Sequence, residues 1–322
     1  MSSVLVLSDA DVRALLDMPS CIEAMAAALA ALERGEAQMP LRFIMRPPAK
    51  QVLGLMPAYR GGADAVFALK EIVVAPANAA LGLDPHQGAV LLHDAETGRL
   101  RAILNASAVT EIRTAAVSAV ATRLLARDDA RVVAILGSGV QGRSHVEAMR
   151  AVLPDCELRV WSRTPEHAVG LALQARASTS ATVAEAVAGA DVVCTCTSAR
   201  EPIVRREWLA PGAHVNAVGS SIPTTRELDA RTVAEASLFV DRRESTLAES
   251  GDFLLAAEEA GLDESHVRAE LGELLVGSHP GRVSADELTV FKSLGLAVED
   301  LAAAELVVAR ARERGVGTEV PF

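Results

Sequence analysis

The segment Gly137–Gly142, with the sequence GSGVQG, constrains the fold of this chain more than any other feature. It follows the apolar run Val132–Leu136 directly and precedes a stretch with a helical pattern, 143–152. A glycine-rich turn between a buried strand and a helix is typical of a βαβ unit. The sequence therefore predicts that a parallel sheet begins at 132.

The alternation of strand and helix continues after this turn. Ala-rich stretches of helical character separate further short apolar runs, at 158–161, 191–196, 214–218 and 237–241. Because parallel strands need crossover connections, this alternation predicts a doubly wound α/β sheet of the Rossmann type. We expect this domain at 118–293.

The residues on either side of that domain follow another pattern. A helical stretch at 8–34, with a second segment beginning near Pro19, precedes short apolar runs separated by turns, at 52–56, 65–74, 88–93 and 100–104. Such runs predict a small, mostly antiparallel sheet, and a long helix is expected at 107–127. The apolar spacing from Leu294 to Val308 predicts an amphipathic helix. This helix could pack back on the first domain, which would make a smaller, discontinuous α+β domain of 1–117 with 294–322.

Composition narrows the class of partner. The chain has 31 Lys and Arg against 42 Asp and Glu, a net charge of -11, which argues against a nucleic acid or an anionic membrane as partner. Its 4 cysteines have neither disulfide nor metal-ligand spacing, so we expect no metal and a reducing, cytoplasmic setting. Neither a signal peptide nor a membrane span is expected from the distribution of apolar residues.

The GSGVQG turn predicts a dinucleotide site. Gly137 would bend the chain tightly, Gly139 would let the backbone approach a pyrophosphate, and Gly142 would let helix and strand pack closely. Val140 and Gln141 then open a helix whose free N–H groups attract anions. The alternative is a purely structural turn.

The end of the next predicted strand indicates which dinucleotide binds. An NAD site usually has Asp or Glu about 20 residues beyond the glycines, for the ribose 2′-hydroxyl. Here that strand ends in Ser162-Arg163-Thr164, which has no carboxylate and offers a guanidinium and two hydroxyls to a 2′-phosphate. We therefore expect NADP(H) to be preferred, with NAD(H) possible. The alternative is that Arg163 is merely solvated.

Basic residues in the first domain suggest an anion site. Lys70 lies on the apolar face of a predicted strand, Arg113 lies among small apolar residues of a predicted helix, and Arg42 precedes the sheet. A buried cation is costly unless it is paired. Each could pair with a carboxylate such as Glu71, Asp94 or Glu111, but the set favours an anion-binding pocket.

Other polar residues are weaker candidates. Asp252, after Gly251, is interpreted as a helix cap rather than a site carboxylate. Cys194 and Cys196 alternate along a predicted strand and are interpreted as core residues.

The chain resembles the ornithine cyclodeaminase/mu-crystallin family over essentially its whole length. The resemblance is carried by Leu69-Lys70, Pro85-His-Gln-Gly88, Thr110-Glu-Ile-Arg-Thr-Ala-Ala116, Gly137-Ser-Gly-Val-Gln141, Val160-Trp-Ser-Arg-Thr164, Asn216-Ala-Val-Gly219, Glu249-Ser-Gly-Asp252 and Phe291-Lys-Ser-Leu-Gly295. It implies that 1–117 with 294–322 is a substrate-binding and dimerisation domain of a homodimer. In that domain Arg42, Lys70 and Arg113 would bind the substrate carboxylate, and Lys70 would be the catalytic residue. We also expect cofactor contacts at Thr197, Val218 and Ser293.

One departure from the family pattern bears on the reaction. Cyclodeaminases of this family carry an Asp shortly after Asn-Ala-Val-Gly, and this chain has Ser221 there. A neutral Ser is a poor general base, so ornithine cyclisation is disfavoured. The resemblance then implies an NAD(P)H-dependent ketimine reductase acting on Δ1-pyrroline-2-carboxylate or Δ1-piperideine-2-carboxylate. The alternatives are an alanine-type dehydrogenase, a cyclodeaminase with another base, or an NADPH-dependent binding protein of the crystallin type.

Overall fold

A computed structural model describes residues 3–48, 51–84 and 86–322. The chain divides into two compact units, 1–113 with 295–322 (unit 1) and 114–294 (unit 2). The sequence analysis divided the chain after 117 and after 293, four residues and one residue from these boundaries. The first boundary falls inside one continuous helix, α3 (Ala106–Leu125).

Unit 1 is built on a mixed, mostly antiparallel sheet. The strand order is β16-β1-β7-β6-β5-β4-β2, and β3 also pairs with β4. The strands are β1 (Ser3–Leu7), β2 (Ala37–Gln38), β3 (Phe43–Met45), β4 (Val52–Arg60), β5 (Val66–Val74), β6 (His86–Asp94), β7 (Leu100–Asn105) and β16 (Thr318–Pro321). Only the β1–β7 pair is parallel among the described pairs of this sheet.

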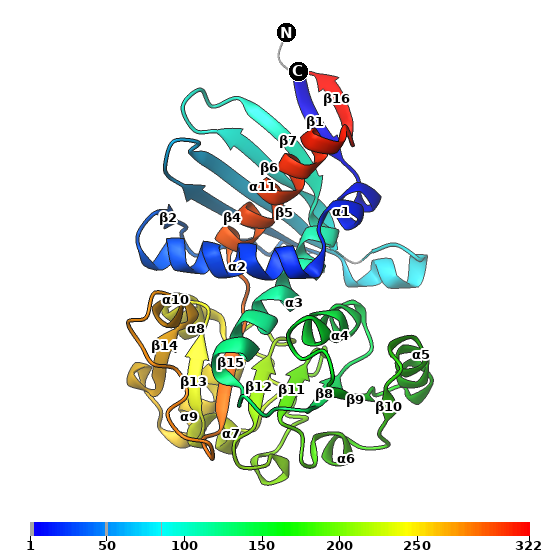
Figure 1. Ribbon diagram of the computed structural model, residues 1–322, viewed down its shortest axis with the longest axis vertical. Coiled ribbons are helices and arrows are strands. Elements are labelled where there is room, and N and C mark those ends of the chain that lie inside the picture. Colours follow the sequence, from blue (N-terminus) through cyan, green and yellow to red (C-terminus); the bar gives the residue numbers. More distant parts are fainter. Residues whose placement is uncertain (1–2, 49–50, 85) are drawn as a thin grey trace. The chain divides into compact units, whose positions relative to one another are not determined.

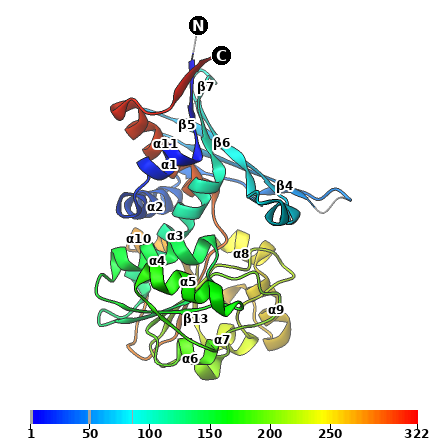
Figure 2. The same ribbon diagram turned by 90° about the vertical axis from the view of Figure 1, so that its right-hand side faces the viewer.

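Helices cover one face of this sheet. They are α1 (Asp9–Leu15), α2 (Met18–Glu33) and α11 (Ala297–Arg314), and α11 contacts β4, β5 and β6 (Figures 1 and 2). Because side chains alternate along a strand, every second residue of β5 faces α11. The cross-strand row Met56, Lys70, Val90 and Leu104 lies on this covered face, and each member is at most 7% exposed. Lys70 is thus held inside an apolar layer.

Unit 2 is a parallel sheet in the order β10-β9-β8-β11-β12-β15-β13-β14. Its strands are β8 (Val132–Leu136), β9 (Glu157–Trp161), β10 (Ser178–Thr179), β11 (Val192–Thr195), β12 (His214–Ala217), β13 (Ser237–Val240), β14 (Val267–Glu270) and β15 (Thr289–Lys292). The chain winds outward from β8 to β10 and then returns to β11, so the direction of winding reverses between β8 and β11. Ligands of such sheets bind at this reversal, outside the carboxyl ends of the strands.

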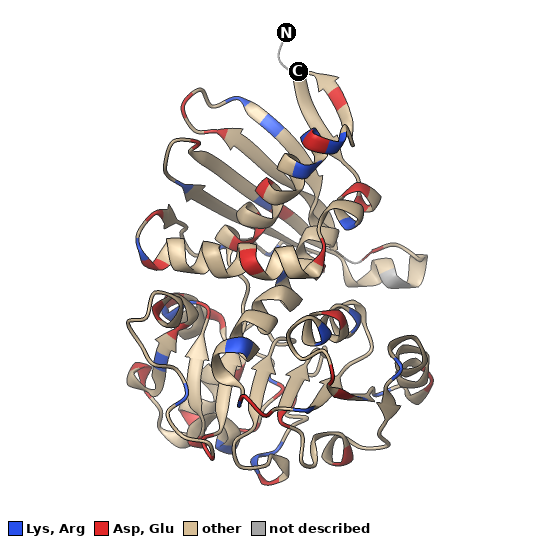
Figure 3. Cartoon of the chain, viewed as in Figure 1, with Lys and Arg blue, Asp and Glu red and all other residues tan. Residues whose placement is uncertain are grey.

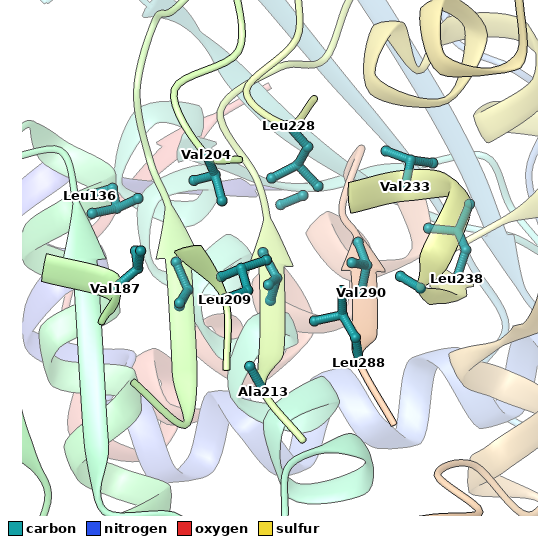
Figure 4. Close-up of a cluster of buried hydrophobic side chains, with 14 of the residues drawn as sticks. Leu136, Val187, Val204, Leu209, Ala213, Leu228, Val233, Leu238, Leu288 and Val290 are labelled. Carbon is teal, nitrogen blue, oxygen red and sulfur yellow. The ribbon is translucent and has the colours of Figure 1, made fainter. Parts of the chain in front are cut away.

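Both faces of the parallel sheet are buried. Its flanking helices are α4 (Val140–Val152), α5 (Pro165–Ala175), α6 (Val183–Val187), α7 (Ala230–Glu235), α8 (Arg243–Glu249), α9 (Gly251–Ala260) and α10 (Leu271–Leu275). Figure 3 shows no charged residue on the central strands β11 and β12, as expected of strands covered on both sides. The core of this unit includes Leu136, Val204, Leu228 and Val290, which lie together between the sheet and its helices (Figure 4).

The predicted α/β fold class is confirmed, and its local signals are present. Ser8 and Asp11 form a reciprocal capping box, and Pro19 lies in the first turn of α2. The stretch 8–34 thus contains two helices, and the second begins at Met18, next to Pro19, as expected. We did not predict β1, β2, β3 and β16 of unit 1, nor β10, β14 and β15 of unit 2. These strands are short or terminal, and partners distant in sequence complete several of them, as when β1 pairs with both β16 and β7.

No single helix in the described part of the chain is long and apolar enough to cross a membrane. The pair α1 and α2, bent by 87°, meets the criterion only when taken together, by length and composition.

Candidate active site

The glycine-rich turn lies at the reversal point of the parallel sheet. Gly137 has a φ of +119°, and its N–H donates to the carbonyl of Trp161 at 2.8 Å. A Cβ on Gly137 would lie 2.4 Å from the carbonyl oxygen of Cys196, and one on Gly142 would lie 2.1 Å from that of Gly137. Both positions therefore require glycine, for the close packing that the sequence predicted.

The same turn offers space and donors for a pyrophosphate. Gly139 is the N-cap of α4, carries no side chain that could satisfy the first N–H groups, and has nothing within 4 Å of an added Cβ. Val140 is 53% exposed at the start of the helix. The Gln141 Oε1 atom is buried without a hydrogen-bond partner among the described residues. An open helix N-terminus beside an unused polar atom fits a dinucleotide.

The end of β9 lies next to this turn. Ser138 Oγ donates to Ser162 Oγ at 2.9 Å, which joins the glycine turn to the predicted ribose site. Arg163 is exposed, and Thr164 is the N-cap of α5 with no side-chain cap bond. Glu166 lies in the first turn of α5, so this edge also carries one negative charge.

The remaining predicted cofactor residues follow three neighbouring strands. Thr197 comes after β11, Val218 after β12 and Ser293 after β15. The N–H of Val218 donates to Thr195 O at 3.1 Å, and that of Ser293 donates to Ala217 O at 3.0 Å. Because parallel strands end at one edge, the fold brings these three residues to the carboxyl edge that also bears the glycine turn.

The cationic site in unit 1 is a buried cluster of charges. Lys70 Nζ lies 2.7 Å from Asp300 Oδ2 and 3.4 Å from Thr110 Oγ1. Arg113 donates from Nε to Asp300 Oδ1 at 3.0 Å and from Nη1 to Glu299 Oε2 at 2.8 Å. Asp300 therefore links the two cations, and all four side chains are at most 5% exposed.

Lys70 and Arg113 pair with Asp300 and Glu299, which were not among the carboxylates expected as alternative partners. Glu71 is exposed on the opposite face of β5, Asp94 caps its own turn through Thr97, and Glu111 pairs with Arg13. Glu299 and Asp300, which the sequence reasoning missed, come from α11 instead. The sequence feature that could have revealed them is a pair of adjacent acidic residues within the apolar helical stretch that begins at Leu294.

Gly295 completes this cluster. It has a φ of +80°, and a Cβ there would lie 2.4 Å from Arg113 Nη1. The turn before α11 must therefore be glycine so that the guanidinium can lie against the backbone.

Burial changes the acidity of Lys70. Desolvation lowers the pKa of the Lys70 ammonium to about 8, although the Asp300 carboxylate opposes this shift and Arg113 reinforces it. An amine with a pKa near neutrality can both hold and release a proton under physiological conditions. The charged and neutral forms of the Lys70 side chain are therefore both accessible near neutral pH.

Two other predicted positions lie apart from this cluster in the chain. Arg42 is half-buried in the loop immediately before β3, whereas Lys70 lies on β5. Ser221 is exposed in the loop after β12 of unit 2, and Ser220 beside it is 1% exposed. In the motif at 85–88, Pro85 lies outside the described residues.

The interpretation of Asp252 as a helix cap is wrong. Ser250 caps α9, by accepting from the N–H of Phe253. Asp252 is 2% exposed and instead accepts from the N–H groups of Glu227 and Leu228 and pairs with Lys292 at 2.9 Å. Sequence spacing could not reveal this role, because the partners are 24 to 40 residues away.

The chain is similar to known proteins in both sequence and structure. The chain is 44% identical to the ketimine reductase mu-crystallin of Mus musculus over 277 residues, 85% of each chain. The structure of Thermococcus litoralis Δ1-pyrroline-2-carboxylate reductase in complex with NADH and L-proline superposes with a TM-score of 0.94, at 36% identity, over 98% of this chain and 100% of that one. An archaeal alanine dehydrogenase dimer with bound NAD also superposes with a TM-score of 0.94, at 30% identity over both whole chains.

The match extends to a family model as well as to individual proteins. The model of the ornithine cyclodeaminase/mu-crystallin family matches residues 3–315, nearly the whole chain. With a parallel sheet bearing a dinucleotide-type glycine turn and a buried pair of cations at the predicted positions, this chain belongs to the ornithine cyclodeaminase/mu-crystallin family.

Proposed function

We propose that this protein is an NAD(P)H-dependent ketimine reductase that reduces the cyclic imino acids Δ1-pyrroline-2-carboxylate and Δ1-piperideine-2-carboxylate to L-proline and L-pipecolate. The observation that carries the proposal is the buried pair Lys70 and Arg113 around Asp300. The relatives named as ketimine and pyrroline-2-carboxylate reductases support this substrate class.

In this proposal the cations of unit 1 bind and protonate the substrate. Arg42 and Arg113 hold the substrate carboxylate, and Lys70 holds a proton at Nζ for the imine nitrogen. Protonation makes the imine carbon electron-poor, so the proton from Lys70 prepares it for reduction. A bound nicotinamide cofactor supplies the hydride. Because the imine nitrogen needs an acid rather than a strong base, Ser221 in place of an acidic residue agrees with reduction.

We propose that NADP(H) is preferred over NAD(H). Ser162, Arg163 and Thr164 end β9 without a carboxylate, so nothing in this tripeptide repels a 2′-phosphate. The exposed Arg163 supplies a positive charge beside the N-terminus of α5, where Glu166 opposes it. The preference is therefore expected to be moderate rather than absolute.

The decisive assay follows oxidation of the reduced cofactor with each cyclic imine, with NADPH and NADH in parallel. Rapid oxidation with either imine is expected, faster at low cofactor concentration with NADPH. Cofactor binding without turnover of either imine would contradict the proposal and favour a binding protein of the crystallin type.

The alanine dehydrogenase alternative rests on a specific observation, the archaeal dimer that superposes over the whole chain. It predicts oxidation of the reduced cofactor with pyruvate and ammonia, and reduction of NAD⁺ with alanine. Turnover of these substrates without turnover of the cyclic imines would replace our assignment. Ammonia release from ornithine with catalytic NAD⁺ would instead indicate a cyclodeaminase.

We also propose that the protein is a homodimer, assembled through the sheet face of unit 1 that α11 does not cover. The cross-strand row Pro57, Leu69, Leu91 and Ile103 is apolar on this face and only partly buried or exposed in the single chain. Phe67, on the same face, is 47% exposed. An apolar sheet face left open to water is typical of an interface.

Light scattering tests this assembly. The wild type is expected at twice the monomer mass, and Leu69→Asp is expected as a monomer, because a charge would be buried in the interface. The control is Leu173→Asp on α5, which is 76% exposed in unit 2 and should leave the mass unchanged. A dimeric Leu69→Asp variant would place the interface elsewhere.

Finally, we expect the protein to act in the cytoplasm. The four cysteines are free thiols, which suits a reducing compartment.

A further inference from the structure

Unit 2 contains a buried carboxylate that the proposed reaction does not use. Glu227 is 0% exposed and accepts four hydrogen bonds. Oε1 accepts from the N–H of Thr197 at 2.8 Å and from Thr197 Oγ1 at 2.6 Å, and Oε2 accepts from the N–H of Gly219 at 2.7 Å and from Thr195 Oγ1 at 2.6 Å. One side chain therefore joins the loop after β11 to the loop after β12.

These two loops touch each other as well as Glu227. A Cβ on Gly219 would lie 2.1 Å from Thr197 O, 2.6 Å from Thr197 N and 2.6 Å from Glu227 Oε1. The backbone at Gly219 thus packs directly against the backbone of Thr197. Displacement of Glu227 would therefore disturb contacts of both loops.

A second buried ion pair holds Glu227 itself. Asp252 Oδ1 accepts from the N–H of Glu227 at 2.7 Å, and Lys292 Nζ donates to Asp252 Oδ2 at 2.9 Å and to Ser220 O at 2.5 Å. Lys292 and Asp252 are 1% and 2% exposed. The network therefore fixes the loop after β12 at two neighbouring residues, Gly219 and Ser220.

The position of these loops on the sheet indicates what they serve. The site expected for the adenine-side ribose is at the end of β9, on one side of the glycine turn, whereas β11 and β12 lie on the other side. A dinucleotide that crosses the carboxyl edge of such a sheet places its second half over the strands beyond the reversal point. The loops that Glu227 joins are therefore on the nicotinamide side.

We propose that Glu227 is a positioning residue, which sets the relative placement of the loops after β11 and β12 and thereby shapes the pocket for the nicotinamide half of the cofactor. This inference rests on the proposed function for its cofactor. It assigns Glu227 no contact with substrate or with the reacting atoms.

The hydrogen-bond pattern makes Glu227→Gln a specific test of how Glu227 holds the two loops. Each carboxylate oxygen of Glu227 faces a backbone N–H, that of Thr197 on one side and that of Gly219 on the other. In Glu227→Gln the amide NH₂ must face one of these donors whichever way the side chain turns. The variant keeps the volume of the side chain and pushes one loop away. Glu227→Asp keeps two acceptors but retracts them, so an intermediate effect is expected.

The matched control is Asp229→Asn. Asp229 lies two residues further along and accepts from Thr232 at the start of α7 and from the N–H of Arg206, not from either of the two loops. It undergoes the same acid-to-amide change in the same segment. Any effect that both variants share reports on general stability.

The experiment measures dissociation constants for NADPH and for 2′-phospho-ADP-ribose, which lacks the nicotinamide, by titration of the full-length protein. For Glu227→Gln we expect NADPH to bind at least about tenfold more weakly, while the fragment stays within about twofold of wild type. For Asp229→Asn both ligands should stay within about twofold. Thermal unfolding of each variant is recorded alongside.

Two results would overturn the inference. Unchanged NADPH affinity in Glu227→Gln would mean that the loops do not depend on this carboxylate. An equal loss of NADPH and fragment affinity would mean that Glu227 supports the unit as a whole. Failure of the proposed function would look different. The wild type would then turn over neither imine, whatever the affinities of Glu227→Gln for NADPH and for the fragment.

Discussion

The acidity of Lys70 makes the strongest prediction about this protein. If Lys70 must carry a proton to donate to the imine nitrogen, kcat/KM falls as the pH rises through its pKa of about 8. About nine-tenths of the Lys70 side chains are protonated at pH 7 and about one-tenth at pH 9, so kcat/KM is expected to fall about tenfold over that interval. An unperturbed lysine would show no such fall below pH 10.

Asp300→Asn tests whether this alkaline limb belongs to Lys70. Asp300 lies 2.7 Å from Lys70 Nζ and favours the charged ammonium. At an effective dielectric constant of about 20, opposite charges at this separation attract by about 6 kcal/mol. Loss of even a quarter of that energy lowers the pKa of Lys70 by about one unit, so the limb should move toward lower pH.

The matched control is Glu305→Gln. Glu305 is on the same helix, α11, but pairs with Arg60 rather than with Lys70. Its neutralisation should leave the alkaline limb in place. The assay is kcat/KM from pH 6 to 10 with saturating cofactor, using both cyclic imines.

The use of two imines separates enzyme titration from substrate titration. A limb that Lys70 causes should have the same midpoint with both ring sizes. A limb that stays at the same pH in Asp300→Asn, or whose midpoint follows the imine, would refute the assignment of Lys70 as the proton donor.

Three further changes probe the cofactor site and the core. Arg163→Ala removes one exposed charge-assisted contact worth about 1–2 kcal/mol, so the KM for NADPH should rise about 5–30-fold while the KM for NADH stays nearly unchanged. An equal change in both KM values would refute the role of Arg163. Gly142→Ala should abolish detectable cofactor binding in a titration, because its Cβ would lie 2.1 Å from Gly137 O, whereas Gly170→Ala in α5 meets nothing within 4 Å and should bind normally. Leu136→Ala should lower the free energy of unfolding by about 2–5 kcal/mol in urea denaturation, and a change below about 1 kcal/mol would mean that the core relaxes around the cavity.

Much of the cofactor-binding unit could be predicted because its signals are local. A strand, a glycine turn and a helix follow one another within about 20 residues, so the sequence order is also the spatial order. Most of the covered face of β5 was equally predictable, since alternation alone places Lys70 with Val66 and Ala68, and all three are buried. The prediction extended to Ile72 and Val74, which are only half-buried. The capping residues of α1 also act within one turn.

The partners of the buried charges could not be predicted in the same way. Asp300, the shared partner of Lys70 and Arg113, lies 230 and 187 residues further along the chain. From the sequence, nearer acids such as Glu111 were equally plausible partners. Glu227 and Lys292 acquire their roles only where parallel strands bring their ends to one edge. An ion pair is set by distance in space, and sequence separation carries almost no information about it.

The sequence by itself thus determined the fold class, the glycine turn and the identity of the cations, because periodicity and steric requirement act between neighbouring residues. The tertiary structure decided which carboxylates neutralise those cations, and how far burial lowers the pKa of Lys70. It also decided that Asp252 serves a buried network rather than a helix end. These properties depend on desolvation and on contacts over long sequence distances, which exist only once the chain has folded.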